Sequence, residues 1–392
     1  MARRHIALGL DIGTHQVKAV IAERQRGGGL PEILGTGIAE SRGLRHGYIV
    51  NGADVARSIK AALAQASAAA GVRPKRCYLS IGGVSLDEFR SSGEAAISRA
   101  DSEITERDVG NALAASERAI PKQVLQNRKV VHSIPLSFRI DGEKVLGGSP
   151  VEMKGGKLSV ETLFITCITQ HLNDLVAAVE STGVEVEDVM VSPLAASLVT
   201  LSKTQKKAGC ILANIGAETV SLVVFEDGIP ISLKVFPIGS ADITNDIALG
   251  LRIPLEEAEN IKLGVYTSAM YSKKKLDDIT TARLSDIFDL IAAHLKKIGK
   301  HELLPAGIIL TGGGSGISSV SDLAKAALKL PSRVAYLTFN VGGKQQQKDS
   351  SWAVAYGLTI WGLSTEEEVG SGIKLPAKAG KSLLTFLQQF LP

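Results

Sequence analysis

Three glycine-bearing segments carry residues that could bind a nucleotide. The first, LGLDIGT (8–14), places Asp11 and then Gly13 at the end of an apolar strand, with Lys18 shortly after. Glycine lets backbone N–H groups approach phosphate oxygens closely, whereas a carboxylate repels phosphate unless a divalent cation lies between them. Mg²⁺ prefers one or two carboxylates together with water and phosphate. Asp11 therefore predicts a magnesium–nucleotide site.

The second segment repeats the first within the same chain. LANIGAETVSLVV (212–224) aligns with the opening so that Asp11 falls on Asn214 and Gly13 on Gly216. Apolar strands look alike, so chance alone can produce such a match. The alternative is a pair of related domains that face each other across a cleft, each offering a hairpin turn to one ligand.

The third segment, TGGGSG (311–316), follows the apolar run 306–310. A glycine-rich loop is a weak signal by itself, and loop flexibility also explains it. The order of the three glycine-bearing segments along the chain strengthens the interpretation that this loop contributes to a nucleotide site. It is neither a Walker loop, since GxxxxGK[ST] occurs nowhere in the sequence, nor a Rossmann fingerprint, whose GxGxxG would follow the first strand.

The surrounding patterns predict an α/β chain. Residues 5–40 indicate three strands, the first two joined by a tight turn, and residues 76–83 indicate a buried strand. Between them, an Ala-rich helix over 52–70 ends at Gly71. Residues 209–240 repeat the strand–turn–strand pattern of the opening.

Residues 84–160 follow a different, α+β pattern. A helix begins at Thr105 with a capping box to Asp108, and Asp141-Gly142 marks a hairpin turn. LFITCIT (163–169) then resumes the α/β pattern.

Further helices are expected near 171–182, 241–250, 255–263, 281–299 and 351–360. The basic run Lys273–Lys275 reads as a solvated loop, with a phosphate or partner contact as the alternative.

Composition predicts a globular chain of several domains. The sequence has 392 residues, of which 45% are apolar and 21% charged, and its net charge of +4 is too small to indicate nucleic-acid binding. Cys77, Cys167 and Cys210 lie in apolar runs, so we expect buried thiols in a reducing compartment. The sequence has no secretory signal, no apolar run of about 18 residues and no HxxxH or CxxC spacing. We therefore expect a cytoplasmic chain without a membrane span or a structural metal site.

The three glycine segments, in this order, resemble the actin/Hsp70/sugar-kinase ATPase superfamily, and in particular the FtsA family of actin-like cell-division proteins. The resemblance covers nearly the whole chain. Residues 212–262 resemble the second phosphate loop and the segment after it, and residues 307–317 resemble the adenosine loop. Residues 130–158 resemble the subdomain inserted in FtsA and are the most family-specific stretch. The resemblance implies an actin-like α/β fold: two duplicated ribonuclease-H-like domains around a nucleotide cleft, with a small inserted α+β subdomain.

The resemblance also implies roles for individual residues. Asp11 would hold Mg²⁺ through water and is the one candidate for a catalytic role. The other expected nucleotide contacts are Gly13, Thr14 and Lys18 at the phosphates, Asn214, Gly216, Ala217 and Thr219 opposite them, Glu259 and Lys262 at the ribose and adenine, and Gly312, Gly313, Gly314 and Ser315 under the adenosine. Glu259 and Lys262 share one helix face, so a surface ion pair is the alternative interpretation of these two residues.

The second phosphate loop departs from the family pattern, which commonly runs Asp-Ile-Gly-Gly-Gly-Thr. Here Asn214 replaces the acid, and Ala217 and Glu218 replace two glycines. Glu218 would place a carboxylate near the phosphates and weaken binding unless it turns outward. Ser192 stands where many superfamily members carry Glu, Gln or Asn to orient the attacking water, and serine is shorter and a poorer base. We therefore expect ATP binding with slow or absent hydrolysis.

The last twelve residues, KSLLTFLQQFLP (381–392), form an amphipathic pattern with one apolar stripe at helical spacing. Such a helix could pack against the protein body or lie in a lipid interface. Residues 363–380 read as a flexible linker, which favours the lipid. The expected membrane contacts are Lys381, Leu383, Leu384, Phe386, Leu387, Phe390 and Leu391.

These patterns together predict the domain organisation. The expected boundaries are 1–83 and 161–195 for the first actin-like domain, with a closing helix near 350–362; 84–160 for the inserted subdomain; 196–228 and 301–349 for the second actin-like domain; 229–300 for its smaller subdomain; 363–380 for the linker; and 381–392 for the membrane helix.

The function implied by the resemblance is an ATP- and Mg²⁺-dependent polymerising adaptor of cell division. It would tether the FtsZ ring, through the FtsZ C-terminal tail, to anionic lipids on the cytoplasmic face of the membrane at midcell. Expected partners are FtsZ, at residues 228–300, further copies of the chain and other division proteins, but no nucleic acid. The alternatives are a PilM-like adaptor of a type IV pilus platform, against which the terminal stripe speaks, and a small-molecule kinase, for which we recognise no catalytic Asp.

Overall fold

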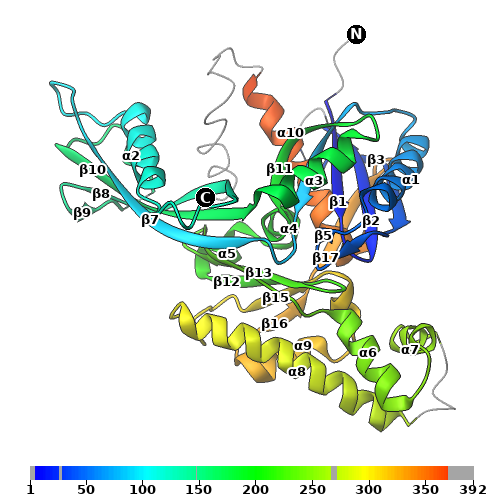
Figure 1. Cartoon of the computed structure of the whole chain (residues 1–392). Helices are drawn as coiled ribbons and strands as arrows, with labels where there is room; N and C mark the ends of the chain where they lie inside the picture. The colour runs from blue at the N-terminus through cyan, green and yellow to red at the C-terminus, as the bar shows by residue number, and fades with distance from the viewer. Residues whose placement is uncertain (1–4, 26–28, 147, 266–271, 370–392) are drawn as a thin grey trace.

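Two large β-sheets form the body of the molecule (Figure 1). The computed structural model describes residues 5–25, 29–146, 148–265 and 272–369. The first sheet has the strand order β11-β6-β1-β2-β3-β17-β18. Its strands are β1 (Ile6–Ile12), β2 (Gln16–Glu23), β3 (Glu32–Glu40), β6 (Arg76–Ile81), β11 (Glu185–Val191), β17 (Tyr336–Val341) and β18 (Lys344–Asp349). A small separate hairpin joins β4 (Leu44–Arg45) to β5 (Tyr48–Ile49).

The second sheet has the strand order β14-β13-β12-β15-β16. Its strands are β12 (Cys210–Ile215), β13 (Val220–Glu226), β14 (Ile229–Phe236), β15 (Ile308–Thr311) and β16 (Ser332–Val334). In each sheet an antiparallel hairpin, β1–β2 or β12–β13, has a third antiparallel strand on one side and two parallel strands on the other. The two halves therefore share one topology, and the internal repeat expected from the sequence is real.

Helices cover the faces of both sheets. The helices are α1 (Gly52–Ala70), α3 (Thr169–Glu180), α4 (Ser192–Thr200), α5 (Lys203–Ala208), α6 (Ser240–Leu251), α7 (Leu255–Lys262), α8 (Lys273–Lys297), α9 (Val320–Leu328) and α10 (Ala353–Val369). Helix α10 lies against β1, β2, β6 and α4, and α8 and α9 pack together below the second sheet in Figure 1. A Cβ atom on Gly9 would collide with the carbonyl oxygen of Ala355, which shows how closely α10 approaches β1.

Strand β12 shows why the second sheet is buried on both faces. Its residues alternate between two cores: Leu212 joins the core of the first half, while Ile211 and Ala213 join the core beneath α8 and α9. Successive strand residues point to opposite faces, so an apolar run such as CILANI suits a strand covered on both sides. This sheet is therefore the wall between the two halves.

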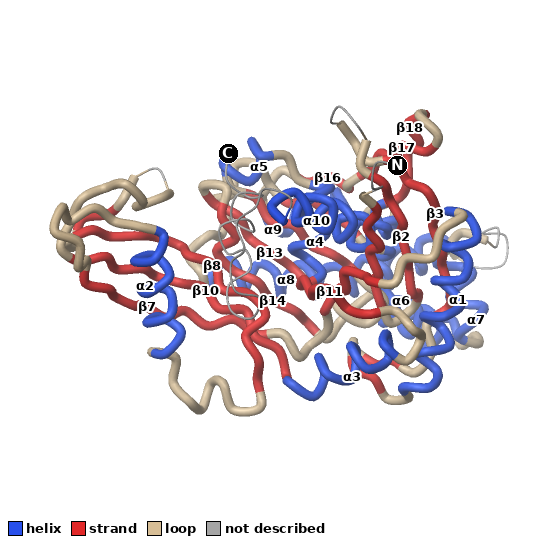
Figure 2. The backbone as a smooth tube through the Cα atoms, turned by 90° about the horizontal axis from the view of Figure 1, so that it is seen from above, coloured by secondary structure: helices blue, strands red, loops and turns tan. Residues whose placement is uncertain are grey.

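The inserted subdomain is a separate sheet with one helix. Its order is β7-β10-β8-β9, with β7 (Asp87–Ala96), β8 (Arg128–Ile140), β9 (Glu143–Lys144) and β10 (Lys157–Ile168), and α2 (Glu106–Arg118) lies along it (Figure 2). The capping box between Thr105 and Asp108 is present, as expected. Asp141 and Gly142 both have positive φ at the β8–β9 turn, which confirms the predicted hairpin.

Two expected domain boundaries do not coincide with the limits of the sheets. The boundary between residues 160 and 161 falls inside β10, which pairs with β7 as far as Thr166 and with β8 as far as Ile168. The later part of β10 nevertheless packs into the core of the first half through Leu163, Ile165 and Cys167. Residues 336–349, expected in the second domain, form β17 and β18, and β17 pairs with β3 at the edge of the first sheet. Both differences arise because strand partners are set by long-range packing, which a local pattern does not reveal.

Two local expectations also fail. Lys273–Lys275 is not a loop: it is the exposed first turn of α8, whose N-cap Ser272 accepts a hydrogen bond from the Lys275 N–H, and the helix starts well before the expected residue 281. Residues 363–369 of the expected linker continue α10. Lysine and glutamate are good helix formers, so the charged residues at both places are compatible with a helix.

The three cysteines are buried and unpaired, as expected. Burial raises the pKa of Cys77 to about 12, of Cys167 to about 11 and of Cys210 to about 12. Across the described ranges, none of the helices combines the length and the apolar character that crossing a bilayer requires.

Candidate nucleotide-binding site

The first candidate phosphate loop is the turn of the β1–β2 hairpin. The Gly13 N–H donates to the carbonyl oxygen of Gln16, 3.1 Å away, and closes the turn. Thr14 is half-buried at its tip. Just below the turn, Asp11 and Lys18 are direct cross-strand partners. Directly opposed residues share one face of a ladder, so the hairpin presents the acid and the base together.

Asp11 is half-buried, and its carboxylate has a polar partner. The hydroxyl group of Ser80, on β6, donates a hydrogen bond to it at 2.8 Å. Burial raises the pKa of Asp11 above its usual value, and this hydrogen bond and the charge of Lys18 offset only part of the rise. A divalent cation beside Asp11 would favour the ionised form, so the residue suits the metal role expected of it.

Lys18 points into the protein rather than into solvent. It is only 7% exposed, and its Nζ atom lies 5.8 Å from the centroid of the Trp352 ring. Burial lowers the pKa of Lys18, while the charges of Asp11 and Asp349 act in the opposite direction. A phosphate group that contacts Lys18 must therefore reach below the protein surface, next to Asp11.

The second candidate phosphate loop is closed in the same way. The Gly216 N–H donates to the carbonyl oxygen of Thr219 at 2.9 Å. Helix α6 begins on this turn, because the N–H groups of Ser240 and Ala241 donate to the carbonyl oxygens of Gly216 and Ala217 at 2.9 and 2.8 Å. The start of the helix fixes the loop and brings the positive end of the helix dipole close to it.

Glu259 and Lys262 form a tightly bonded pair on α7. The Lys262 Nζ atom lies 2.7 Å from the Glu259 carboxylate, 2.8 Å from Thr244 Oγ1 and 3.1 Å from the carbonyl oxygen of Ser240. Burial alone would raise the pKa of Glu259, but hydrogen bonds from Lys262 and Thr244 outweigh it and lower the pKa. The Lys262 side chain is 9% exposed, so this is no loose surface ion pair; it ties α7 to the start of α6.

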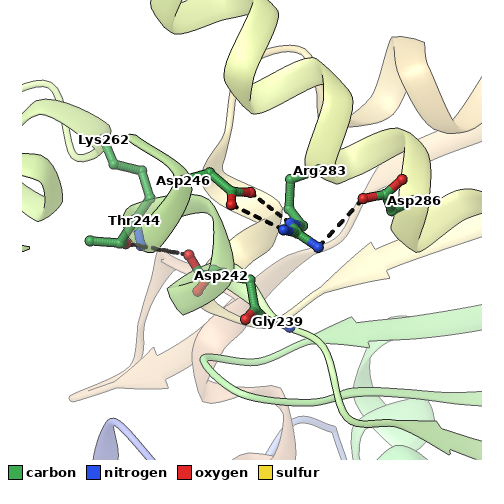
Figure 3. A network of polar contacts seen from close by, with 8 residues as sticks. Gly239, Asp242, Thr244, Asp246, Lys262, Arg283 and Asp286 are labelled. Atoms are coloured by element: carbon green, nitrogen blue, oxygen red, sulfur yellow. Dashed lines mark hydrogen bonds and ion pairs between the residues drawn. The ribbon is translucent and has the colours of Figure 1, made fainter. Parts of the chain in front are cut away.

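Neighbouring contacts hold α6 in place from its other side (Figure 3). The Gly239 N–H donates to the Asp242 carboxylate at 2.8 Å. Arg283, on α8, donates to both carboxylate oxygens of Asp246, at 2.7 and 3.0 Å, and lies 3.4 Å from Asp286. Bidentate guanidinium–carboxylate pairs are geometrically specific, so α8 orients the helix that supports the second loop.

The glycine loop lies against the second hairpin. It leaves β15 at Gly312, whose φ is 87°, and continues as the short helix η1 (Gly313–Gly316). A Cβ atom on Gly312 would collide with the Asn214 side chain, and one on Gly314 with the Ile215 side chain. Asn214 therefore reaches the glycine loop, and close packing explains two of its three successive glycines.

A cavity of about 390 Å³ opens beside the glycine loop. Its lining includes Gly312, Gly313, Ser315, Tyr336 and Asp349. A Cβ atom on Gly313 would meet nothing within 4 Å, so packing inside the protein does not require glycine there. Gly313 therefore leaves open space beside the cavity that a ligand group could occupy.

Hydrogen bonds join this loop to the segment before α10. Thr311 Oγ1 donates to the carbonyl oxygen of Ser350 at 2.9 Å, and the hydroxyl groups of Ser315 and Ser350 are 3.1 Å apart. Ser350 begins the short helix η2 (Ser350–Trp352), which follows Asp349 and contains Trp352. The glycine loop is thus linked to the segment that carries Asp349 and Trp352. The charge of Asp349 acts on Lys18, and the ring of Trp352 lies near its Nζ atom.

Two of the residues that depart from the family pattern, Ser192 and Glu218, form hydrogen bonds to backbone groups of the first half. Ser192, the first residue of α4, donates its hydroxyl group to the carbonyl oxygen of Ile81 at 3.1 Å. The Glu218 carboxylate accepts the backbone N–H of His46.

The structure therefore joins the second hairpin, α6 and α7 by hydrogen bonds, packs the glycine loop against the second hairpin, and brings Lys18 of the first hairpin to within 5.8 Å of the centroid of the Trp352 ring. Glu259 and Lys262 bond to α6 rather than to the glycine loop. Sequence reasoning missed Ser80, Trp352 and Asp349, because their contacts join segments far apart in the chain. The expected membrane residues, Lys381, Leu383, Leu384, Phe386, Leu387, Phe390 and Leu391, lie outside the described residues.

Comparison with protein families agrees with this architecture. Residues 211–357 match the family model "Cell division protein FtsA", and residues 83–166 match "SHS2 domain inserted in FTSA". The second match ends within β10, as the corrected boundary of the inserted sheet requires.

Curated relatives match over most of their length. Cell division protein FtsA of Borreliella burgdorferi is 30% identical, covering 91% of this chain and 91% of that protein. FtsA of Bacillus subtilis is also 30% identical, covering 97% of this chain and 89% of that protein.

Solved structures share the fold at lower identity. A PilM–PilN type IV pilus biogenesis complex has a TM-score of 0.68 at 19% identity, covering 91% of this chain and 98% of that one. MreB5 of Spiroplasma citri bound to AMPPNP has a TM-score of 0.54 at 14% identity, covering 95% and 100%. With its duplicated actin-like halves, its inserted subdomain and these relatives, the chain belongs to the FtsA family of actin-like cell-division proteins.

Proposed function

We propose that this chain binds ATP with Mg²⁺ between its two halves, assembles into filaments and tethers FtsZ to the inner face of the cell membrane. One observation carries the nucleotide part of the proposal. Two hairpin turns of the same build are closed through Gly13 and Gly216. The second hairpin lies against the glycine loop, and hydrogen bonds from this loop to Ser350 connect it to the segment whose Trp352 lies over Lys18 of the first hairpin.

Asp11 suits the metal end of the site. A carboxylate whose pKa is raised by desolvation is stabilised in its ionised form by a cation, and Mg²⁺ needs only one or two carboxylates when phosphate and water supply its other ligands. When bound, the metal would neutralise the phosphate charge that Asp11 otherwise repels. Lys18 would add a point charge on the same face of the hairpin.

The cavity beside Gly313 suits the base end of the nucleotide. Gly313 leaves open space there, and Tyr336, 71% exposed, also belongs to the lining of the cavity. Aromatic side chains favour stacked partners. The AMPPNP present in the MreB5 structure supports a nucleotide on this fold.

Hydrolysis is expected to be slow. Serine is short for orienting an attacking water, and the Ser192 hydroxyl group already donates to the carbonyl oxygen of Ile81. The nucleotide would then act mainly as a structural ligand that sets how the halves face each other, a role that fits a polymerising adaptor better than a metabolic enzyme.

A PilM-like role is the alternative, favoured by the TM-score of 0.68 with the PilM–PilN complex. At 19% identity that likeness concerns the fold. The FtsA relatives at 30% identity and the apolar stripe of 381–392 favour a membrane tether in cell division.

The sharpest test of the nucleotide site is Gly313→Val. This residue faces open space and has no positive φ, so a larger side chain fits the fold but fills the cavity. We expect the affinity for MgATP, measured by isothermal titration calorimetry, to fall by about tenfold or more, equivalent to about 1.4 kcal/mol.

Gly110→Val is the matched control. Gly110 also has open space around its Cβ position, but it lies on α2 in the inserted subdomain, far from the cavity lining. Its affinity should equal that of the wild type. Absence of binding heat for the wild-type protein at millimolar MgATP, or equal affinity for both valine variants, would contradict the proposed site.

A further inference from the structure

The turn between β4 and β5 is held in an unusual backbone conformation. His46 and Gly47 have φ values of 48° and 88°, which together make the two-residue turn typical of tight hairpins. Glycine adopts this conformation freely, whereas histidine does so only against a steric penalty. The turn is pressed onto the end of β6: a Cβ atom on Gly47 would lie 2.6 Å from the Cα atom of Gly83, and the Val84 N–H donates to the carbonyl oxygen of His46 at 3.3 Å.

The second phosphate loop contacts this turn through two atoms of one residue. The Glu218 carboxylate accepts the backbone N–H of His46, and the Glu218 carbonyl oxygen lies 3.2 Å from His46 Nδ1. A carbonyl oxygen only accepts hydrogen bonds, so Nδ1 carries the imidazole proton in this contact. The two residues are 172 positions apart, and both are half-buried. The contact therefore fastens a hairpin tip of the second half to a rigid turn of the first half.

Glu218 lies within the second candidate phosphate loop. Glu218 directly precedes Thr219, whose carbonyl oxygen closes the loop on Gly216. A glycine at this place would offer only its backbone, whereas Glu218 adds a negative charge that repels phosphate. It also occupies the His46 N–H, one of the donors that the first half presents toward this loop.

We propose that the Glu218–His46 contact is an autoinhibitory latch, which closes the two halves in the absence of nucleotide and must open when the phosphates enter. This inference rests on the proposed nucleotide site and adds its regulation. A ligand that binds only the unlatched form has an apparent affinity reduced by the fraction of protein that is unlatched. Glu218 thus sets the nucleotide concentration at which the contact between the two halves opens.

Two variants test the latch. Glu218→Gln keeps a hydrogen-bond acceptor and removes the charge, whereas Glu218→Gly removes the whole side chain. The control is Glu226→Gln, at the far end of the same hairpin, where the carboxylate pairs with Lys300 at 2.5 Å. We expect MgATP to bind about tenfold more tightly to Glu218→Gly, with Glu218→Gln between it and the wild type, and no change in the control.

Hydrogen exchange of the His46 amide supplies a readout that does not depend on affinity. The wild-type amide should be protected without nucleotide and exchange faster with MgATP, and Glu218→Gly should exchange fast in both states. Equal MgATP affinity in all proteins together with unchanged His46 protection overturns the latch and keeps the proposed function. Absence of MgATP binding in every protein overturns the proposed function and the latch with it.

Discussion

A few individual side chains determine the polar contacts at the candidate nucleotide-binding site. Asp11 was identifiable from the sequence because a carboxylate inside an apolar strand is costly and calls for a partner. Its actual support, the Ser80 hydroxyl group on β6, was not, because the hydrogen bond crosses between strands far apart in the chain. The same limit applies to Glu218: the sequence showed a charge that needed to turn away, and only the fold shows His46 as the group that receives it.

His294 makes the stability of the second half depend on pH. This residue of α8 is buried, its Nε2 atom lies 2.9 Å from Ser232 Oγ, and burial, helped by the charges of Lys234 and Lys297, lowers its pKa from 6.5 to about 4. Below pH 6.5 the unfolded chain takes up the proton and the folded chain does not. Stability contributed by His294 is therefore complete above pH 6.5 and is lost as the pH falls toward 4.

Between pH 7 and pH 5 this histidine should remove roughly 2 kcal/mol from the free energy of unfolding. Urea unfolding at both pH values measures the free energy of unfolding of the wild type and of His294→Gln. Between pH 7 and pH 5 the variant should lose roughly 2 kcal/mol less of this free energy than the wild type. His132, whose pKa burial lowers to about 3, contributes in both proteins and cancels in the comparison. An identical loss in the two proteins would show that His294 does not titrate as described.

At the scale of secondary-structure elements, helix ends and tight turns were predicted correctly from local sequence, whereas the pairing of distant strands was not. The helix end at Gly71, the capping box of α2 and the hairpin at Asp141 all depend on backbone chemistry within a few residues. Strand β18, with the sequence KQQQKD, contains no apolar residue and escaped notice because it is an exposed edge strand. The same limit applies to the candidate nucleotide site. Its three loops were predicted from the sequence, but the cavity lined by Gly313 and Tyr336 is formed by elements far apart in the chain and could not be predicted.

Helices α6 and α7 present exposed leucines within the region expected to contact FtsZ. Leu249 is 78% exposed and Leu263 is 64% exposed. We predict that Leu249→Asp and Leu263→Asp each weaken binding of an FtsZ C-terminal tail peptide by about tenfold or more. Either change removes an apolar anchor and places a charge in the interface. Fluorescence anisotropy with a labelled peptide measures this.

Leu303 provides the matched control for that experiment. It is also 64% exposed, but it follows α8 and lies outside the expected region. Leu303→Asp should bind the peptide as the wild type does, and all three variants should keep the MgATP affinity of the wild type. Equal peptide binding by all the variants would place the FtsZ contact elsewhere.

For the whole molecule, membrane attachment is predicted to require many copies at once. A twelve-residue amphipathic helix is marginal alone in water, and one copy should bind lipid reversibly. Copies aligned in a filament would gain about 10²–10⁴ in apparent affinity from linkage. Sedimentation with vesicles that contain anionic phospholipid should therefore increase with MgATP, and deletion of residues 381–392 should abolish it.

Two controls make this result specific. Vesicles of neutral phospholipid should retain less protein, because the lysines near residue 381 are attracted to anionic headgroups. The deleted protein should still bind MgATP and form filaments visible by electron microscopy. Sedimentation of the deleted protein at the wild-type level would assign lipid binding to another part of the chain.

The contact between α10 and β1 means that the chain cannot complete its first sheet in the order in which it is synthesised. Strand β1 leaves the ribosome almost at once, yet Ala355, which lies against Gly9, is made more than 300 residues later, as is β17, which pairs with β3. At about 5–20 residues per second, the nascent strand keeps an uncovered apolar face on the order of tens of seconds. A ribosome stalled before α10 would therefore hold a chain whose exposed apolar strand favours aggregation until α10 covers it.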